Sequence, residues 1–76
     1  MTTTVAKQAL ATMVTCDEDH LHVTLVDGRE LSVPLAWFPR LRAATTQQRA
    51  VWRLLGHGAG IHWPELDEDL SVQALL

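Results

Sequence analysis

Residues 20–33 read His20-Leu21-His22-Val23-Thr24-Leu25-Val26-Asp27-Gly28-Arg29-Glu30-Leu31-Ser32-Val33, and their alternation of apolar and polar side chains predicts two strands. Leu21, Val23 and Leu25 would share one face of the first strand, with His20, His22 and Thr24 on the other. Asp27-Gly28 predicts a two-residue type I′ turn, because that turn needs positive φ at both central positions. The stretch is therefore expected to form a β-hairpin with one buried face.

A further strand is expected upstream of this hairpin. Met13-Val14-Thr15-Cys16 is rich in residues that suit strands, and the polar residues Asp17-Glu18-Asp19 supply a turn. The first 33 residues thus predict a three-stranded antiparallel meander with one solvated face. Residues 1–10 are small and rich in threonine and alanine, so we expect a mobile N-terminal segment ahead of a single domain at residues 11–76.

Helical signals follow the predicted sheet. Pro34 should end the sheet and begin one helical turn, which Pro39 stops. Thr45 and Gln48 match a capping box, which predicts a main helix over residues 46–55. The apolar stripe of this helix would consist of Ala50, Val51, Leu54 and Leu55.

The last third of the chain is dense in special residues. Ile61-His62-Trp63 is expected to be extended, because Pro64 disfavours the helical region for the residue before it. Asp67, Glu68 and Asp69 should cap a short final helix and pair with arginines from the first half of the chain or from the main helix. The predicted fold is α+β: a three-stranded meander packed against one main helix plus a short helical or irregular C-terminal segment.

Composition narrows the classes of function. A chain of 76 residues with 47% hydrophobic residues is expected to be one small globular domain. A net charge of −3 argues against direct nucleic-acid binding, which needs a basic face. The single cysteine excludes an internal disulfide and fits a reducing compartment. With no apolar run of about 20 residues and no secretory signal, we expect a cytoplasmic protein without membrane contact.

Four blocks of residues carry a resemblance to a known family. They are Asp27-Gly28-Arg29; Val33-Pro34-Leu35-Ala36-Trp37-Phe38-Pro39-Arg40-Leu41; Ala44-Thr45 with Gln48-Arg49 and Trp52; and Gly60-Ile61-His62-Trp63-Pro64 with Leu66-Asp67-Glu68-Asp69-Leu70-Ser71-Val72 and Leu75-Leu76. In order and spacing they resemble the bacterial domain-of-unknown-function family 2442 from about residue 12 to residue 76. The resemblance implies a small α+β domain without established enzymatic activity. Family members stand alone, some of them antitoxin-like, or precede a helix-turn-helix domain, and no such DNA-binding half is expected in this chain.

The acidic stretch permits two interpretations. His62 with Asp67, Glu68 and Asp69 could be a histidine–carboxylate pair for acid–base chemistry. No nucleophile, glycine-rich phosphate loop or metal signature accompanies these residues, so we favour a structural loop and expect no enzymatic activity.

Cys16, His20 and His22 are a second candidate cluster. Sulfur and two imidazoles suit zinc, but the spacing matches no standard zinc pattern and a fourth ligand is not evident. Solvated histidines beside a small buried thiol are the favoured interpretation. We therefore expect neither a metal nor a cofactor.

Aromatic and basic residues suggest a binding surface. Most of the large rings should lie in the core, with at least one partly exposed as an interface anchor. The arginines Arg40, Arg42, Arg49 and Arg53 could contact phosphate, but we favour their pairing with the acids at residues 65–69. The candidate interaction surface consists of Arg29, Trp37, Arg40, Arg49, Trp52, His62, Trp63, Asp67, Glu68 and Asp69.

Three functions remain open from the sequence. A protein–protein interaction module is favoured, bound either to a separate partner such as a toxin or to a second copy as a homodimer. A regulatory accessory or small-ligand sensor domain comes second, and an enzyme that uses His62 comes third. The sequence does not name the partner.

Overall fold

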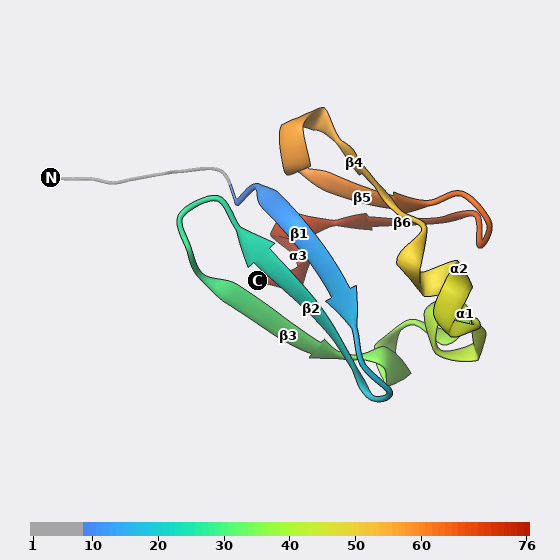
Figure 1. The fold of residues 1–76 in the computed structure, drawn as a ribbon. Helices are drawn as coiled ribbons and strands as arrows, with labels where there is room; N and C mark the ends of the chain where they lie inside the picture. The colour runs from blue at the N-terminus through green and yellow to red at the C-terminus, as the bar shows by residue number, and fades with distance from the viewer. Residues whose placement is uncertain (1–8) are drawn as a thin grey trace, which may run out of the picture.

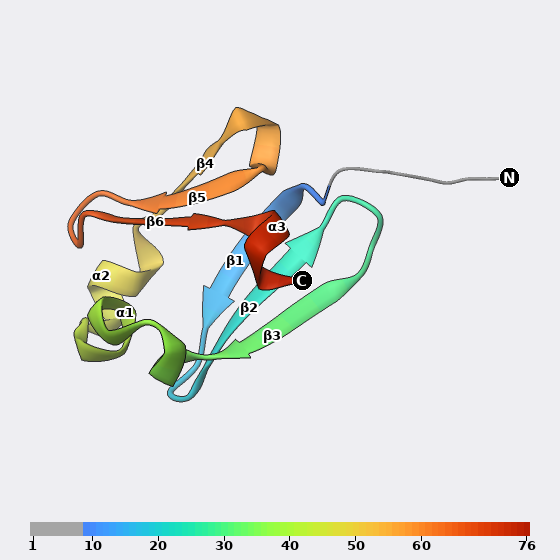
Figure 2. The ribbon, with the colours of Figure 1, turned by 180° about the vertical axis from the view of Figure 1, so that it is seen from behind.

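The computed structural model describes residues 9–76, which form two three-stranded antiparallel sheets joined and closed by short helical segments (Figures 1 and 2). Of the segment predicted to be mobile, residues 1–8 lie outside this description. Ala9 is buried, and the Leu10 carbonyl accepts a hydrogen bond from the Val26 N–H (2.8 Å). Ordered contacts therefore already include residues 9 and 10.

The first sheet contains β1 (Ala11–Cys16), β2 (His20–Leu25) and β3 (Glu30–Pro34), with β2 in the centre. Leu21, Val23 and Leu25 are buried, whereas the alternate residues of β2 lie on the opposite, more exposed face. The predicted three-stranded meander is confirmed. A register shift between Ala11 and Met13 marks a bulge at the start of β1.

The turn between β2 and β3 has three residues rather than the predicted two. The Gly28 N–H donates to the Leu25 carbonyl (3.0 Å), and the Leu25 N–H donates to the Arg29 carbonyl (2.7 Å). Gly28 has a φ of 93°, but Asp27 does not have a positive φ. The type I′ prediction is therefore wrong, because only the last residue of this loop is left-handed.

Valine at position 28 should destabilise the protein by more than about 1 kcal/mol, because β-branched residues are strained at positive φ. A Cβ there would meet no atom within 4 Å, so the loss would come from the backbone rather than from a clash. Urea unfolding measures the effect, with Gly28→Asn as a control that tolerates this conformation better. A parent-like unfolding midpoint for Gly28→Val would contradict the turn geometry.

Two prolines organise the segment after β3. Pro34 ends the strand and precedes one 3₁₀ turn, η1 (Leu35–Trp37). The turn stops before Pro39 as predicted, because Phe38 is not helical (φ −129°, ψ 85°). Pro39 then occupies the first turn of a second helix, α1 (Pro39–Ala43). A proline is favourable there, because the N–H that it lacks would have no partner within the helix.

The capping box is confirmed, but the predicted main helix is wrong. In α2 (Thr46–Ala50) the Gln48 N–H donates to Thr45 Oγ1 (3.0 Å), and the Thr45 N–H donates to Gln48 Oε1 (2.9 Å). Val51 is already extended, with φ −101° and ψ 98°. From there Trp52 and Leu54 are partly buried, whereas Val51, Arg53 and Leu55 are exposed, which is the period of a strand.

A second sheet, rather than the predicted main helix, covers the inner face of the first sheet. It contains β4 (Arg53–Leu55), β5 (Gly60–Trp63) and β6 (Glu68–Ser71), with β5 in the centre. Leu54, Ile61 and Leu70 form one row across the three strands, and this row packs in the core. β5 confirms the predicted extended segment, and the α+β class holds with short helices only.

The acidic residues do not cap the final helix. Asp67 lies in the β5–β6 loop at a φ of 51°, and Glu68 and Asp69 belong to β6. The final helix, α3 (Val72–Leu75), is capped instead by Ser71, whose hydroxyl accepts the Ala74 N–H (3.4 Å). The capping prediction is therefore wrong, because the strand continues past the acids and a nearer serine supplies the cap.

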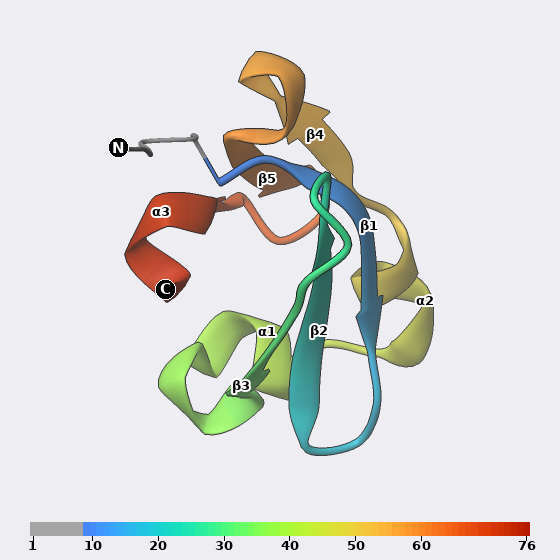
Figure 3. The same cartoon turned by 90° about the vertical axis from the view of Figure 1, so that its left-hand side faces the viewer.

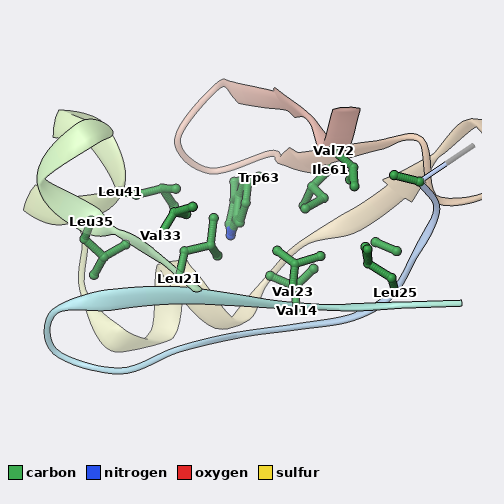
Figure 4. Packing of buried hydrophobic residues seen from close by; sticks show 12 residues of the cluster. Val14, Leu21, Val23, Leu25, Val33, Leu35, Leu41, Ile61, Trp63 and Val72 are labelled. Carbon is green, nitrogen blue, oxygen red and sulfur yellow. The ribbon is translucent and has the colours of Figure 1, made fainter. Parts of the chain in front are cut away.

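The hydrophobic core lies between the two sheets (Figure 4). Leu21 and Val23 of the first sheet face Ile61 and Trp63 of the second, as Figure 4 shows. The short helical segments complete this core with Leu35, Leu41 and Val72.

Gly58 joins the two halves of the chain. The 3₁₀ turn η2 (Gly56–Gly58) connects β4 to β5 and packs on β1. A Cβ on Gly58, which has a φ of 104°, would lie 2.3 Å from the Ala11 carbonyl oxygen. Only glycine allows this approach. Within residues 9–76, no helix has the length and apolar character that crossing a membrane requires.

Candidate functional site

A groove of about 580 Å³ runs along the outer edge of β1. One side is β1 itself with the turn that follows it, and the other is α2 with Trp52; Figure 3 shows α2 beside the C-terminal half of β1. The lining residues are Met13, Val14, Thr15, Cys16, Asp17, Glu18, Thr46, Arg49, Ala50 and Trp52. We call this feature the β1 edge groove.

The backbone of β1 presents hydrogen-bonding groups to the groove. The Asp17 N–H donates to the His20 carbonyl in the turn to β2 (3.0 Å). Because backbone hydrogen-bonding groups alternate in direction along a strand, every second residue counted back from Asp17 also directs its N–H and C=O groups toward β2. Val14 and Cys16 therefore direct their N–H and C=O groups away from β2. Among residues 9–76 no other strand pairs with β1, and no backbone or side-chain hydrogen bond reaches these two residues.

The groove has an acidic end. Asp17 Oδ2 bonds to His22 Nε2 (2.7 Å), and Asp17 Oδ1 accepts the N–H groups of Asp19 (2.8 Å) and His20 (2.6 Å). These contacts, the His22 bond first, hold the pKa of the Asp17 carboxyl well below its usual range. Because Glu18 also lines this end, negative charge is concentrated where β1 stops.

The opposite wall is braced by Arg49. Its Nε donates to the Leu41 carbonyl (2.8 Å) and its Nη2 to the Arg42 carbonyl (2.8 Å), so the guanidinium ties α2 to the end of α1. The Arg49 carbonyl accepts the Trp63 Nε1–H (3.1 Å), which also ties α2 to β5.

The thiol of Cys16 lies in the groove. Burial raises the pKa of this thiol; the charge of Arg49 partly offsets the rise, and the charge of Asp17 adds to it. The thiol is therefore neutral.

The outer face of the first sheet carries a polar relay that sequence reasoning missed. His22 bonds to Asp17 through Nε2 and to Ser32 Oγ through Nδ1 (2.8 Å). With the proton on Nε2, the Ser32 hydroxyl donates to Nδ1, as in a nucleophile–base–carboxylate series. Ser32 could have been found from its register opposite His22. Of these three residues only Asp17 lines the β1 edge groove, whereas His22 and Ser32 lie on the outer face of the sheet.

His62 and Asp69 form a second histidine–carboxylate pair. They lie opposite each other on β5 and β6, and His62 Nδ1 bonds to Asp69 Oδ1. Arg53 of β4 lies opposite His62, so an arginine, a histidine and an aspartate form one row on the outer face of this sheet. The side chain of Asp69 is 69% exposed, which places this pair at the surface rather than in a cleft.

The predicted pairing of acidic and arginine clusters occurs through one residue. Arg40 Nη1 donates to the Asp67 carbonyl (2.7 Å) and lies 3.8 Å from the Glu68 carboxylate. This contact ties α1 to the β5–β6 loop. Asp69 pairs with His62 rather than with an arginine.

The remaining predicted surface residues are dispersed. Arg29 pairs with Asp27 inside the β2–β3 turn (2.8 Å). Trp37 is 64% exposed and packs edge-to-face on Phe38, which confirms that one ring is exposed. Trp63 is fully buried in the core. Only Arg49 and Trp52 of the predicted surface line the β1 edge groove.

The structure separates the residues of the candidate zinc cluster. Cys16 lies opposite Leu21 on the inner face of the first sheet, whereas His22 points to the outer face and uses both ring nitrogens. Within residues 9–76, no three histidine, cysteine, aspartate or glutamate side chains are placed to hold a metal ion.

Asp17→Asn tests the charge at the acidic end of the groove. Because the folded-state pKa of Asp17 is depressed, its ionisation stabilises the fold above the unfolded value of about 3.9, and this contribution is lost as the pH falls further. The variant should be less stable than the parent at pH 7, and the difference should narrow below about pH 4. Urea midpoints across this range measure it. Glu18→Gln, which removes a carboxylate without hydrogen bonds among residues 9–76, should show no such gap.

A known protein family matches this chain over the whole of the fold described above. A family model described as a protein of unknown function, DUF2442, matches residues 11–76. The chain belongs to the DUF2442 family. This confirms the family resemblance seen in the sequence, and the match begins at the first residue of β1 and includes every strand and helix described above.

A solved structure shares the DUF2442 chain's fold. It is the crystal structure of a protein of unknown function from Rhodospirillum rubrum ATCC 11170, with 30% sequence identity and a TM-score of 0.78. The alignment covers 91% of this chain and 86% of the other. No curated protein matches the chain. Neither the family nor this relative carries a functional description.

Proposed function

We propose that this DUF2442 chain is a small non-catalytic protein–protein interaction module that binds its partner in the β1 edge groove. The observation that carries the proposal is an uncharged strand edge beside an apolar cavity. Met13-Val14-Thr15-Cys16 contains neither the lysine nor the proline with which exposed edges are usually protected. Binding of a toxin, as in the antitoxin-like relatives that the sequence suggested, falls within this proposal.

Two features support binding rather than catalysis or nucleic-acid recognition. The imidazoles of His22 and His62 both lie on outer sheet faces, and neither lines the groove. Arg29, Arg40 and Arg49 are engaged with carboxylates or carbonyls, which leaves less cationic surface for phosphates. We place the module in the cytoplasm, where reducing conditions keep Cys16 as a thiol.

A second candidate function is small-ligand sensing. The groove volume of about 580 Å³ lies within the range of about 300–1,000 Å³ that is usual for small-ligand pockets. The open, strand-lined shape favours a protein partner over an enclosed small molecule.

An affinity pull-down from the native cell, compared across two matched variants, tests the proposed function. Ala50 ends α2 and lines the groove, whereas Ala43 ends α1 and does not; both are exposed. Ala50→Arg fills the groove and should lose the partner, whereas Ala43→Arg should retain it. A partner retained equally by both variants would remove the groove from the proposal. No enrichment by the parent over an unrelated bait would refute the interaction module.

A further inference from the structure

We infer that the β1 edge groove receives one extended segment of a partner protein as an added β-strand. The sequence of this segment is a basic residue, an apolar residue, a residue of any type and a second apolar residue, in that order. The inference rests on the proposed interaction function and gives the chemistry of the partner. It is built from the direction of the β1 backbone, the size of the groove, the burial of its walls and the charge at its end.

The backbone of β1 sets the pairing. Val14 and Cys16 each direct one donor and one acceptor into the groove, so an antiparallel strand can exchange four hydrogen bonds with them. Antiparallel pairing is the commoner geometry and is slightly the more stable per residue. This type of recognition obtains affinity from the main chain and specificity from alternate side chains.

The size of the groove admits a short strand. An extended residue occupies about 160 Å³, given a rise of about 3.3 Å, a strand spacing of about 4.8 Å and a sheet separation of about 10 Å. The groove of about 580 Å³ therefore holds roughly three to four residues. That length matches the edge from Met13 to Cys16, between the bulge and the turn.

The walls of the groove set the apolar positions. Val14 and Cys16 pack on the inner face of the first sheet, as do their partners in β2. Residues paired with them on an added strand would also point inward, toward Trp52 and Ala50. The segment therefore needs small apolar side chains at two positions separated by one residue.

The charge at the end of β1 sets the basic position. An antiparallel segment begins beside Asp17 and Glu18, because β1 ends there. The residue just before the first apolar one would pair with Asp17, so a lysine or arginine complements the acidic end. The segment pattern is thus basic, apolar, any, apolar.

A second copy of this chain fits the groove less well than a single segment. α2 and Trp52 flank the edge of β1 in every copy. Edge-to-edge pairing of two copies would bring both α2 helices and both Trp52 rings to the same interface. A segment from a partner brings only its own backbone and side chains.

Peptide binding to the full chain tests the inference. The probe is the peptide acetyl-Lys-Val-Thr-Val-Thr-amide. Calorimetry measures its affinity for the chain, and amide hydrogen exchange locates where it binds. We expect saturable one-to-one binding that slows exchange at the Val14 and Cys16 amides. N-methylation of both valines should weaken binding at least about tenfold, because it removes the donors to β1 but keeps both side chains. Replacing the lysine by glutamate should weaken it roughly threefold to tenfold, with the difference shrinking at high salt.

Variants of the protein locate the peptide. Ala50→Arg should abolish binding of the probe, and Ala43→Arg should leave it unchanged. Equal affinity for the N-methylated peptide, or slowed exchange elsewhere only, would overturn strand addition. Sedimentation of the parent at high micromolar concentration showing a dimer that Ala50→Arg dissolves would assign the groove to a second copy and also overturn it. If the probe fails while cellular partners still depend on Ala50, the interaction function stands and this inference falls.

Discussion

Alanine in place of Trp63 is expected to remove a large fraction of the free energy of unfolding. Trp63 is fully buried between the two sheets, and its Nε1–H donates to the Arg49 carbonyl. Truncating such a side chain costs about 3–5 kcal/mol, from the lost burial of apolar atoms together with the cavity left behind. A domain of this length holds only about 4–11 kcal/mol in total, at about 0.05–0.15 kcal/mol per residue.

Far-UV circular dichroism and urea unfolding would measure this loss. Trp37→Ala is the matched control, because that ring is largely exposed, and its change should stay within about 0.5 kcal/mol. Trp63→Phe separates packing from the hydrogen bond, since it keeps a large ring but leaves the Arg49 carbonyl without its donor. Unfolding of Trp63→Ala at the parent's midpoint would show that Trp63 does not hold the sheets together.

Alanine at position 58 should destabilise the protein by about 2–5 kcal/mol, because strain and overpacking act together. Gly58 has a φ of 104°, and its new Cβ would lie 2.3 Å from the Ala11 carbonyl oxygen. That oxygen is backbone in β1 and cannot turn aside as a flexible side chain would. The expected result is the loss of the contact between η2 and β1.

Gly56→Ala separates the two causes. Gly56 also has a positive φ, of 58°, but a Cβ there would meet only the Ala59 Cβ at 3.6 Å, an ordinary contact. This variant should lose about 1–2 kcal/mol from backbone strain alone. Comparable thermal midpoints for the two alanine variants would argue against a close approach of Gly58 to Ala11.

The first half of the fold could be predicted because its signals are local. The alternation in residues 20–33, the turn around Gly28 and the capping box at Thr45 each follow from neighbouring residues. The prediction for the second half was wrong where the same residues fit both a helical and a strand pattern. The residues Ala50, Val51, Leu54 and Leu55 fit a helix, yet Trp52 and Leu54 also alternate with exposed neighbours, and pairing with β5 decides for the strand.

The acidic residues show how tertiary structure overrides propensity. The dipole of a helix favours acidic residues at its N-terminus, so Asp67, Glu68 and Asp69 predict the start of a final helix. Aspartate and glutamate are also depleted in strands. In β6 Glu68 lies near Arg40 and Asp69 pairs with His62, which compensates for their poor strand propensity. Arg40 belongs to α1, far from Glu68 in the sequence, and His62 meets Asp69 only through the register of β5 and β6.

The candidate site could be predicted only in its parts. Arg49 and Trp52 were named from the sequence, and Met13 to Cys16 were assigned to a strand. That this strand lies at the edge of its sheet depends on the topology, and that α2 stands beside it depends on where that helix ends. Ser32 was not predicted, because its hydrogen bond to His22 depends on the register between β2 and β3.

The burial of Val72 has a consequence for biosynthesis. This residue is fully buried and lies 38 positions beyond Pro34, the last residue of the meander, as the numbering shows. During translation the meander therefore emerges with Leu21, Val23 and Val33 uncovered, and nothing in the first half can cover them. Domains fold as units, so this chain should remain collapsed but incomplete until Val72 has been added and is free to pack. In that interval the unpaired edge of β1 is next to exposed apolar surface, which makes the nascent chain a natural client for chaperones.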